Sequence, residues 1–138
     1  MNADFSNAHD RHRQDADLLF ASHRWANADH LYGMAAECGL KRIMQAFGML
    51  VSPTSGSPTA KDDRVHADGI WTRFESYRSG HHQGASYVLP LPSPFDNWKA
   101  EQRYAHQANF DLARAQAHQA GAKLISELVK QAQLDGLI

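Results

Sequence analysis

The sequence predicts an all-α protein, an antiparallel bundle of four to five helices with one long proline-rich loop. Composition is the first reason, because 21 of the 138 residues are Ala whereas Val, Ile and Thr together number 11. Ala is the best helix former, and β-branched residues favour strands. Periodicity is the second reason, because apolar residues recur at steps of three and four along four segments. Residues 1–138 are expected to form a single domain.

The four predicted helices cover residues 6–23, 25–50, 62–77 and 109–134. The second is the most regular, and its small residues Ala28, Ala35, Ala36 and Gly39 predict close approach of a partner helix. Gly33 and Gly39 are unfavourable in a helix interior, so they either mark tight packing or are simply tolerated there. Gly48 is the expected terminator of this helix. Two Asp residues suit the start of the third helix, and Asn109 suits the start of the fourth. An up-and-down order follows as the simplest connection of such helices.

Two segments between the helices read as loops. Residues 51–60, VSPTSGSPTA, are rich in Pro, Ser and Gly. Residues 79–96 contain the run LPLPSP, whose proline spacing forbids a helix and favours an extended path. The aromatic segment WKAEQRY follows at once. We expect it to pack across the bundle.

Charge and cysteine content exclude several classes of protein. The formal net charge is -1 and the isoelectric point is near 6.7, which gives no global electrostatic signature of nucleic-acid or anionic-membrane binding. A single cysteine, Cys38, permits no intramolecular disulfide and is expected to be a small buried hydrophobe. No segment approaches the ~18 apolar residues of a membrane span, and residues 1–13 are polar. These features predict a cytoplasmic protein with no membrane association.

Residues 10–77 resemble the HEPN (higher eukaryote and prokaryote nucleotide-binding) superfamily. The first segment, DADLLFASHRW, is similar to the family's first helix. The second, ANADHLYGMAAECGLKRIM, carries the Ala-Ala-Glu and Leu-Lys elements of its second helix at Ala35, Ala36, Glu37, Leu40 and Lys41. His66 opens the third helix, as a histidine does in that family. The resemblance implies a helical bundle that forms a homodimer.

Many HEPN proteins are metal-independent RNases with an Arg and a His separated by four to six residues in a late helix. This chain departs from that pattern. Only Arg24 and His30 have the family spacing, and they lie in the second helix. In the late segment, Arg103 and His106 are separated by two residues. The resemblance is therefore to a divergent member that lacks the usual RNase spacing.

Candidate functional residues fall into two groups. An RNase site would use Arg103 and His106, or Arg24 and His30, as phosphate-binding and acid–base groups. Glu37 and Lys41 are four residues apart in the favoured order, and either form a structural pair or, with His66, contact a ligand. Arg103 is a further candidate partner for Glu37. Trp98, Arg103 and Tyr104 either stack on a base and contact phosphate or anchor the proline-rich loop.

Nine histidines raise the question of a metal site, for example one built from His30, His66 and a carboxylate. No HExxH or CxxC motif is present, so we expect no metal and no cofactor. The leading hypothesis is a non-catalytic module that binds RNA, a nucleotide or a protein partner. A divergent metal-independent RNase of toxin type is the first alternative, and a helical-bundle metal-binding protein is the second.

Overall fold

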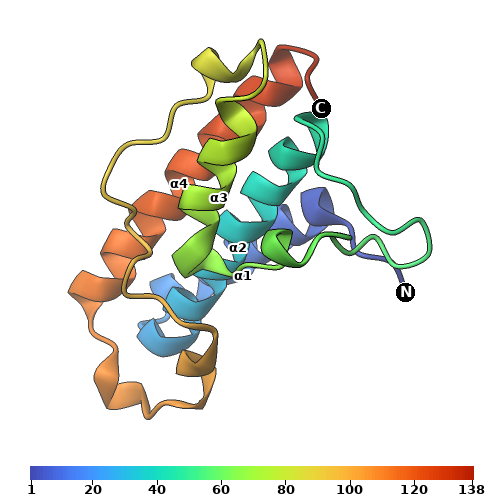
Figure 1. The fold of residues 1–138 in the computed structure, drawn as a ribbon. Coiled ribbons are helices and arrows are strands. Elements are labelled where there is room, and N and C mark those ends of the chain that lie inside the picture. The colour runs from blue at the N-terminus through green and yellow to red at the C-terminus, as the bar shows by residue number, and fades with distance from the viewer.

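Four α-helices dominate the computed structural model, which describes residues 1–138 (Figure 1). They are α1 (Phe5–Ala21), α2 (Trp25–Ala46), α3 (Ala67–Arg78) and α4 (Leu112–Leu134). Four short 3-10 turns lie in the connections, namely η1 (Lys61–Asp63), η2 (Gly84–Ser86), η3 (Ala100–Tyr104) and η4 (Gln107–Asn109). The chain has no strand, only one isolated bridge between Val51 and Pro58. The prediction of an all-α bundle is confirmed.

Helix α2 is the central helix, and the other three pack against it (Figure 1). Helix α1 runs antiparallel to α2, because His9 contacts Ala35 whereas Asp17, two turns later, contacts Tyr32. The expected up-and-down order ends there. Helix α3 runs in the same direction as α2, since its first turn lies near Glu37 and its Phe74 lies near Phe47.

Helix α4 also runs parallel to α2. His118 near its start contacts Asp29, and Ile125 two turns later lies against Gly39. Both connections are long enough to return along the length of the bundle before the next helix begins (Figure 1). The long loops therefore determine the topology, whereas the short turn between α1 and α2 produces the one adjacent antiparallel pair.

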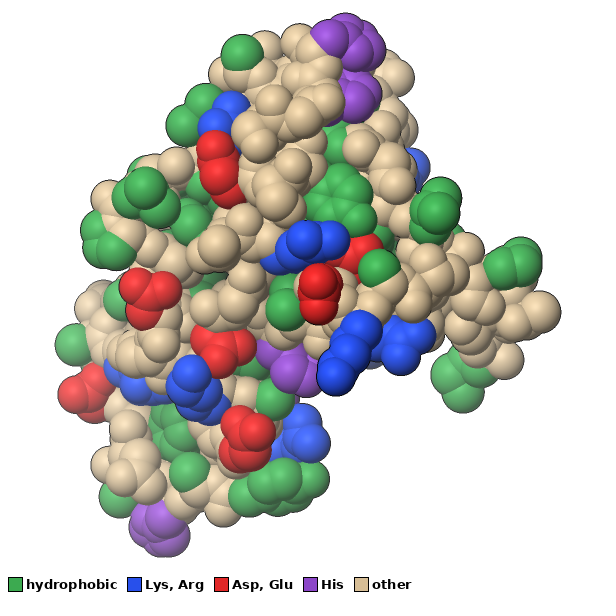
Figure 2. All heavy atoms as spheres, in the orientation of Figure 1, with side chains coloured by type: hydrophobic (Ala, Val, Ile, Leu, Met, Phe, Trp, Pro, Cys, Tyr) green, Lys and Arg blue, Asp and Glu red, His purple; other side chains and the backbone are tan.

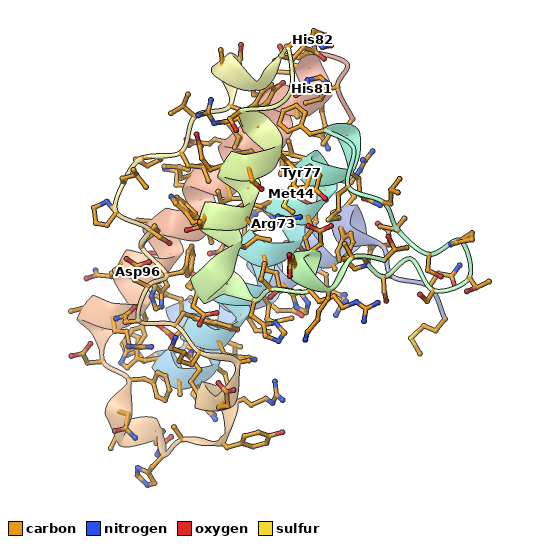
Figure 3. All side chains as sticks on the ribbon, in the orientation of Figure 1. Met44, Arg73, Tyr77, His81, His82 and Asp96 are labelled. Carbon is orange, nitrogen blue, oxygen red and sulfur yellow. The ribbon has the colours of Figure 1, made fainter.

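Helix boundaries differ from the sequence-based expectation at three places. Helix α2 ends at Ala46. Gly48, the predicted terminator, follows two residues later and has a φ of 108°. Helix α3 starts at Ala67 and not at residue 62, because the Asp63 carboxylate is buried and accepts hydrogen bonds from Arg73 and Tyr77 of α3. Figure 3 shows Arg73 and Tyr77 together on α3.

The cap of α4 also differs from the prediction. Helix α4 starts at Leu112, and the side chain of Asp111 accepts a hydrogen bond from the Arg114 amide at 2.9 Å. Asn109, the predicted cap, lies in η4 instead. A carboxylate at this position satisfies a free amide and opposes the positive end of the helix dipole, so Asp111 fits the role better.

One apolar core lies between α2, α3, α4 and the proline-rich loop. Its central fully buried side chains are Leu40, Ile43, Ile70, Phe74, Phe95, Trp98 and Ile125. Small residues let the helices approach, as predicted: a Cβ atom on Gly33 would lie 2.1 Å from Nε1 of Trp98, and one on Gly39 would lie 2.6 Å from Ile125. Cys38 is also buried, as expected. Burial, then the Glu37 charge, raises the pKa of its thiol to about 12.

Candidate functional site

Helix α2 carries a charged stripe on the side that faces the start of α3. Glu37 and Lys41 lie one turn apart and both side chains are buried, with exposed fractions of 8% and 6%. Lys41 Nζ donates to Glu37 Oε1 at 2.7 Å, and Nδ1 of His66 lies 3.1 Å from Oε2. Both carboxylate oxygens therefore have partners. Arg103 is not among them, so the suggested Glu37–Arg103 pair is wrong.

A buried ion pair on a helix otherwise lined with apolar and small residues is costly, because desolvation offsets most of the attraction between the charges. His66, the residue that precedes α3, connects the pair to solvent, since its side chain is 54% exposed. The ring of Phe5 lies 5.8 Å from the Lys41 ammonium and closes the other side. The stripe is thus a polar site that reaches solvent at its His66 end.

His30 continues this stripe two turns before Glu37. Its ring stacks on the buried indole of Trp98, with centroids 5.2 Å apart and planes 16° apart. Burial lowers the pKa of His30 below its ordinary value, and the positive charge of Arg103 lowers it further, against the opposing carboxylates of Asp29 and Glu37. His30 is therefore neutral at pH 7. Its Nδ1 is buried and has no hydrogen-bond partner, so we assign the ring proton to Nε2.

Turn η3 carries Arg103, whose charge acts on His30, and Tyr104, whose ring lies under the Arg103 guanidinium. The guanidinium lies 4.8 Å from the centre of the Tyr104 ring, and Tyr104 is 78% exposed. Arg103 makes no hydrogen bond or ion pair within the protein, unlike Arg13, Arg73, Arg78 and Arg114. We call Arg103, Tyr104 and His30 the η3 site. It combines a free cation, an exposed aromatic face and a neutral imidazole.

A buried polar network holds η3 against the bundle. Asp29 accepts hydrogen bonds from His118 of α4 at 2.5 Å and from Gln102 of η3 at 2.6 Å. Arg114 donates to the other side of Gln102 at 3.1 Å. Trp98 donates its indole N–H to the Asp29 carbonyl at 3.3 Å. The residue immediately before Arg103 is therefore fixed to two helices.

The sequence-predicted site residues do not form one site. Glu37, Lys41 and His66 come together, and Arg103 of η3 lies near His30. Trp98 is fully buried and anchors the loop. The pair Arg24 and His30 does not converge, because six residues turn a helix to positions roughly 120° apart. His106 caps η4, where its Nδ1 accepts from the Ala108 amide, and Arg24 lines a separate cavity.

Sequence reasoning missed the network around Asp29. Asp29 and His118 are 89 residues apart in the chain, and both were hidden in Ala-rich patterns. The available signal was a lone carboxylate and a lone imidazole on the apolar faces of two long helices. Buried groups of this kind require partners, which pointed to a contact between them.

No known protein family, curated protein or solved structure matches the chain. None of its helices combines the length and apolar character needed to cross a bilayer. No three His, Cys, Asp or Glu side chains converge in a group that could hold a metal ion.

Proposed function

We propose that this protein is a non-catalytic module that binds single-stranded RNA or a nucleotide at the η3 site. The observation that carries the proposal is the unpaired Arg103 guanidinium stacked on the exposed Tyr104 ring. An aromatic face accepts a base of any sequence, and a guanidinium binds phosphate through paired hydrogen bonds. The divergent HEPN resemblance agrees with this ligand class, and it leads us to propose a cytoplasmic homodimer.

The rest of the surface favours a local site over a global electrostatic one. Figure 2 shows Lys and Arg side chains interspersed with Asp and Glu side chains, mostly over the middle and lower parts of this face, and the net charge is -1. Long-range attraction of a polyanion is therefore weak. Binding then depends on stacking and on a few direct phosphate contacts, which Tyr104 and Arg103 offer.

The divergent RNase is the second candidate, and one observation favours it. Burial, and then the charge of Arg103, lower the pKa of His30, so a neutral imidazole lies near a positive charge. A neutral imidazole can take a proton from a ribose hydroxyl while a cation stabilises the phosphorane-like charge. An RNase would require His30 and Arg103 to face the same phosphate.

Fluorescence polarisation with labelled single-stranded RNA, in metal-free buffer, tests the binding proposal. Base–aromatic stacking contributes about 1–3 kcal/mol, so Tyr104→Ala should weaken binding about tenfold or more. Arg103→Ala should have a similar effect. Arg42→Ala is the matched control, because Arg42 lies on α2, has no partner and is away from η3. Equal affinity for all four proteins would reject the η3 site.

A gel assay on the same samples separates the two candidates. The binding module leaves the RNA intact. Cleavage that disappears in Arg103→Ala and His30→Gln, and persists in His106→Ala, would establish the RNase with His30 as its base. Cleavage lost in His106→Ala would instead move the base to His106. Absence of both binding and cleavage would turn attention to a protein partner.

A further inference from the structure

A second site lies at the turn between α1 and α2, on side chains that the η3 site does not use. A cavity of about 310 Å³ opens there between residues 23–27 and η4. Its walls are His23, Arg24, Trp25, Asn27, Gln107 and Phe110. In Figure 1 this turn and η4 both lie at the lower end of the bundle. The volume is at the small end of the range for small-molecule pockets.

The polar side chains of this cavity have no partners within the protein. His23, Arg24, Trp25, Asn27 and Gln107 make no side-chain hydrogen bond and no ion pair. The groove between α1 and α4 is different, because there Arg13 pairs with Asp17, and Tyr32 bonds to both Asp17 and Gln119. Four of these side chains are exposed to solvent and Trp25 is partly buried, so a ligand can bond to them by replacing water, without breaking a contact within the protein.

The charge of the cavity points to an anion. Arg24 is its only permanently charged wall residue, and no carboxylate lines it. Arg24 is exposed and free, so it loses no existing contact when it binds a ligand. A guanidinium in this state favours phosphate or carboxylate oxygens.

The aromatic walls point to a planar ring. His23 stacks on Trp25 with centroids 5.0 Å apart and planes 21° apart, and Phe110 forms a further wall. His23 is the one non-glycine residue with a positive φ, at 59°. This left-handed conformation ends α1, because the His23 amide donates to the Phe20 carbonyl and the Arg24 amide donates to the Leu19 carbonyl. The turn that follows carries the stacked His23 and Trp25 rings.

We propose that this cavity binds a nucleotide unit, with its phosphate on Arg24 and its base against the His23–Trp25 stack. The unit is either a free nucleoside monophosphate or one residue of a single-stranded RNA. Asn27 and Gln107 supply the amide groups that hydrogen-bond the edge of the base. Because its residues are not those of the η3 site, the cavity can be tested independently of the proposed function.

Tryptophan fluorescence offers a direct readout of this site. Trp71 and Trp98 are buried, whereas Trp25 is partly exposed on the cavity wall. The wild-type protein is titrated with AMP, adenosine, inorganic phosphate and an oligoadenylate. AMP should change the emission, adenosine and phosphate should each bind at least tenfold more weakly, and Trp25→Phe should lose the signal. Calorimetry then measures AMP binding to Trp25→Ala, which should be about tenfold weaker because the stacking surface is removed.

Arg24→Ala is the decisive variant, because an exposed side chain without contacts can be removed without unfolding the chain. It should weaken AMP binding at least tenfold, whereas Arg11→Ala, an equally exposed arginine of α1, should change it less than twofold. Tighter binding of the oligoadenylate than of AMP, lost in Arg24→Ala, would identify RNA as the source of the nucleotide. Equal affinity for the two would identify a free nucleotide.

Two results would overturn the inference. The first is that Arg24→Ala binds AMP and RNA with the same affinity as the wild type. The other is no binding of AMP or oligoadenylate at millimolar concentration. If Arg103→Ala weakens RNA binding and Arg24→Ala does not, the η3 site is retained and this cavity is rejected. The reverse pattern would retain the cavity and reject the η3 site.

Discussion

Asp29 Oδ1 lies 2.5 Å from Nδ1 of His118, and neither side chain is accessible to solvent. The contact joins the first turns of α2 to the first turns of α4. His118 Nε2 pairs in turn with the Asn97 side chain at 2.9 Å, and Gln102 bonds to Asp29. One carboxylate therefore connects two helices and the end of the proline-rich loop. It holds the segment that carries Arg103 in place.

Asp29→Ala should destabilise the fold by about 3 kcal/mol, because removing one partner of a buried charged pair leaves the others desolvated and unpaired. Urea unfolding followed by circular dichroism measures the change. Asp15→Ala is the control, since Asp15 is exposed on α1 without a partner and should change stability by less than about 0.5 kcal/mol. A loss below about 1 kcal/mol in Asp29→Ala would show that the network contributes little to folding.

Gly33→Ala tests the close approach of Trp98 to α2. The new Cβ would lie 2.1 Å from the indole Nε1, so Trp98 has to move away from the Asp29 carbonyl. Overpacking of this kind costs about 1–3 kcal/mol, which exceeds the gain in helix propensity from Ala. Thermal unfolding should show a lower Tm, together with altered tryptophan emission.

Gly69→Ala is the matched control for Gly33→Ala. Gly69 lies in α3, and its new Cβ would meet Val65 at 3.4 Å, an ordinary contact. Helix propensity then dominates, and the substitution should stabilise the protein by about 0.5–1 kcal/mol. Equal effects of the two substitutions would mean that Trp98 does not pack as tightly as the structure shows.

Stability should fall as the pH falls through the range where unfolded histidine takes up a proton. Burial lowers the pKa of His9, His12 and His30, so each stays neutral in the folded chain at pH values where the unfolded chain binds a proton. The unfolded state then holds more protons, and the free energy of unfolding rises with pH. Stability is complete above about pH 6.5 and is lost progressively below it.

His9 is the clearest source of this dependence. Its Nδ1 lies 2.7 Å from the Ala35 carbonyl and its Nε2 lies 3.1 Å from the Ser126 hydroxyl. His9→Gln should flatten the dependence of unfolding free energy on pH between 7 and 5, by at most about 1.4 kcal/mol per pH unit. Urea titrations at several pH values measure the slope. An unchanged slope in His9→Gln would assign the effect to His12 and His30.

The sequence carries the secondary structure more clearly than the topology. Periodicity identified α2 and the end at Gly48, because both depend on local backbone preferences. The start of α3 was misplaced because Asp63, a good local cap, is buried against Arg73 instead. The parallel direction of α3 and α4 depends on where two long loops return, and local propensity does not encode that path.

The candidate site was likewise predictable only in its local features. Glu37 and Lys41 were recognisable from helical spacing, and Arg103 and Tyr104 from their residue types. The sequence also grouped His66 with that pair as a candidate ligand residue, but it did not predict the contact of His66 with Glu37, because the two residues are 29 positions apart. Proximity across that separation is a property of the packed bundle. The proximity of Arg103 to His30, in place of the Arg24–His30 and Arg103–His106 pairs considered from the sequence, has the same origin.

Glu37 and Lys41 allow structural and functional roles to be separated. Glu37→Ala leaves a buried ammonium without its partner and should cost about 3–5 kcal/mol in unfolding free energy. Glu37→Leu combined with Lys41→Met replaces the pair with apolar groups of similar size and should restore most of that stability. Arg13→Ala, which breaks an exposed pair of the same spacing, is the control and should cost less than about 1 kcal/mol.

The restored double variant then decides what the buried pair does. If it is stable and binds RNA as the wild type does, Glu37 and Lys41 only support the fold, and the η3 site carries the ligand. If it is stable but binds at least tenfold more weakly, the stripe from His30 to Lys41 belongs to the binding site. A double variant no more stable than Glu37→Ala would contradict the pairing itself, because the loss would then arise from packing around Glu37 and not from an unpaired charge.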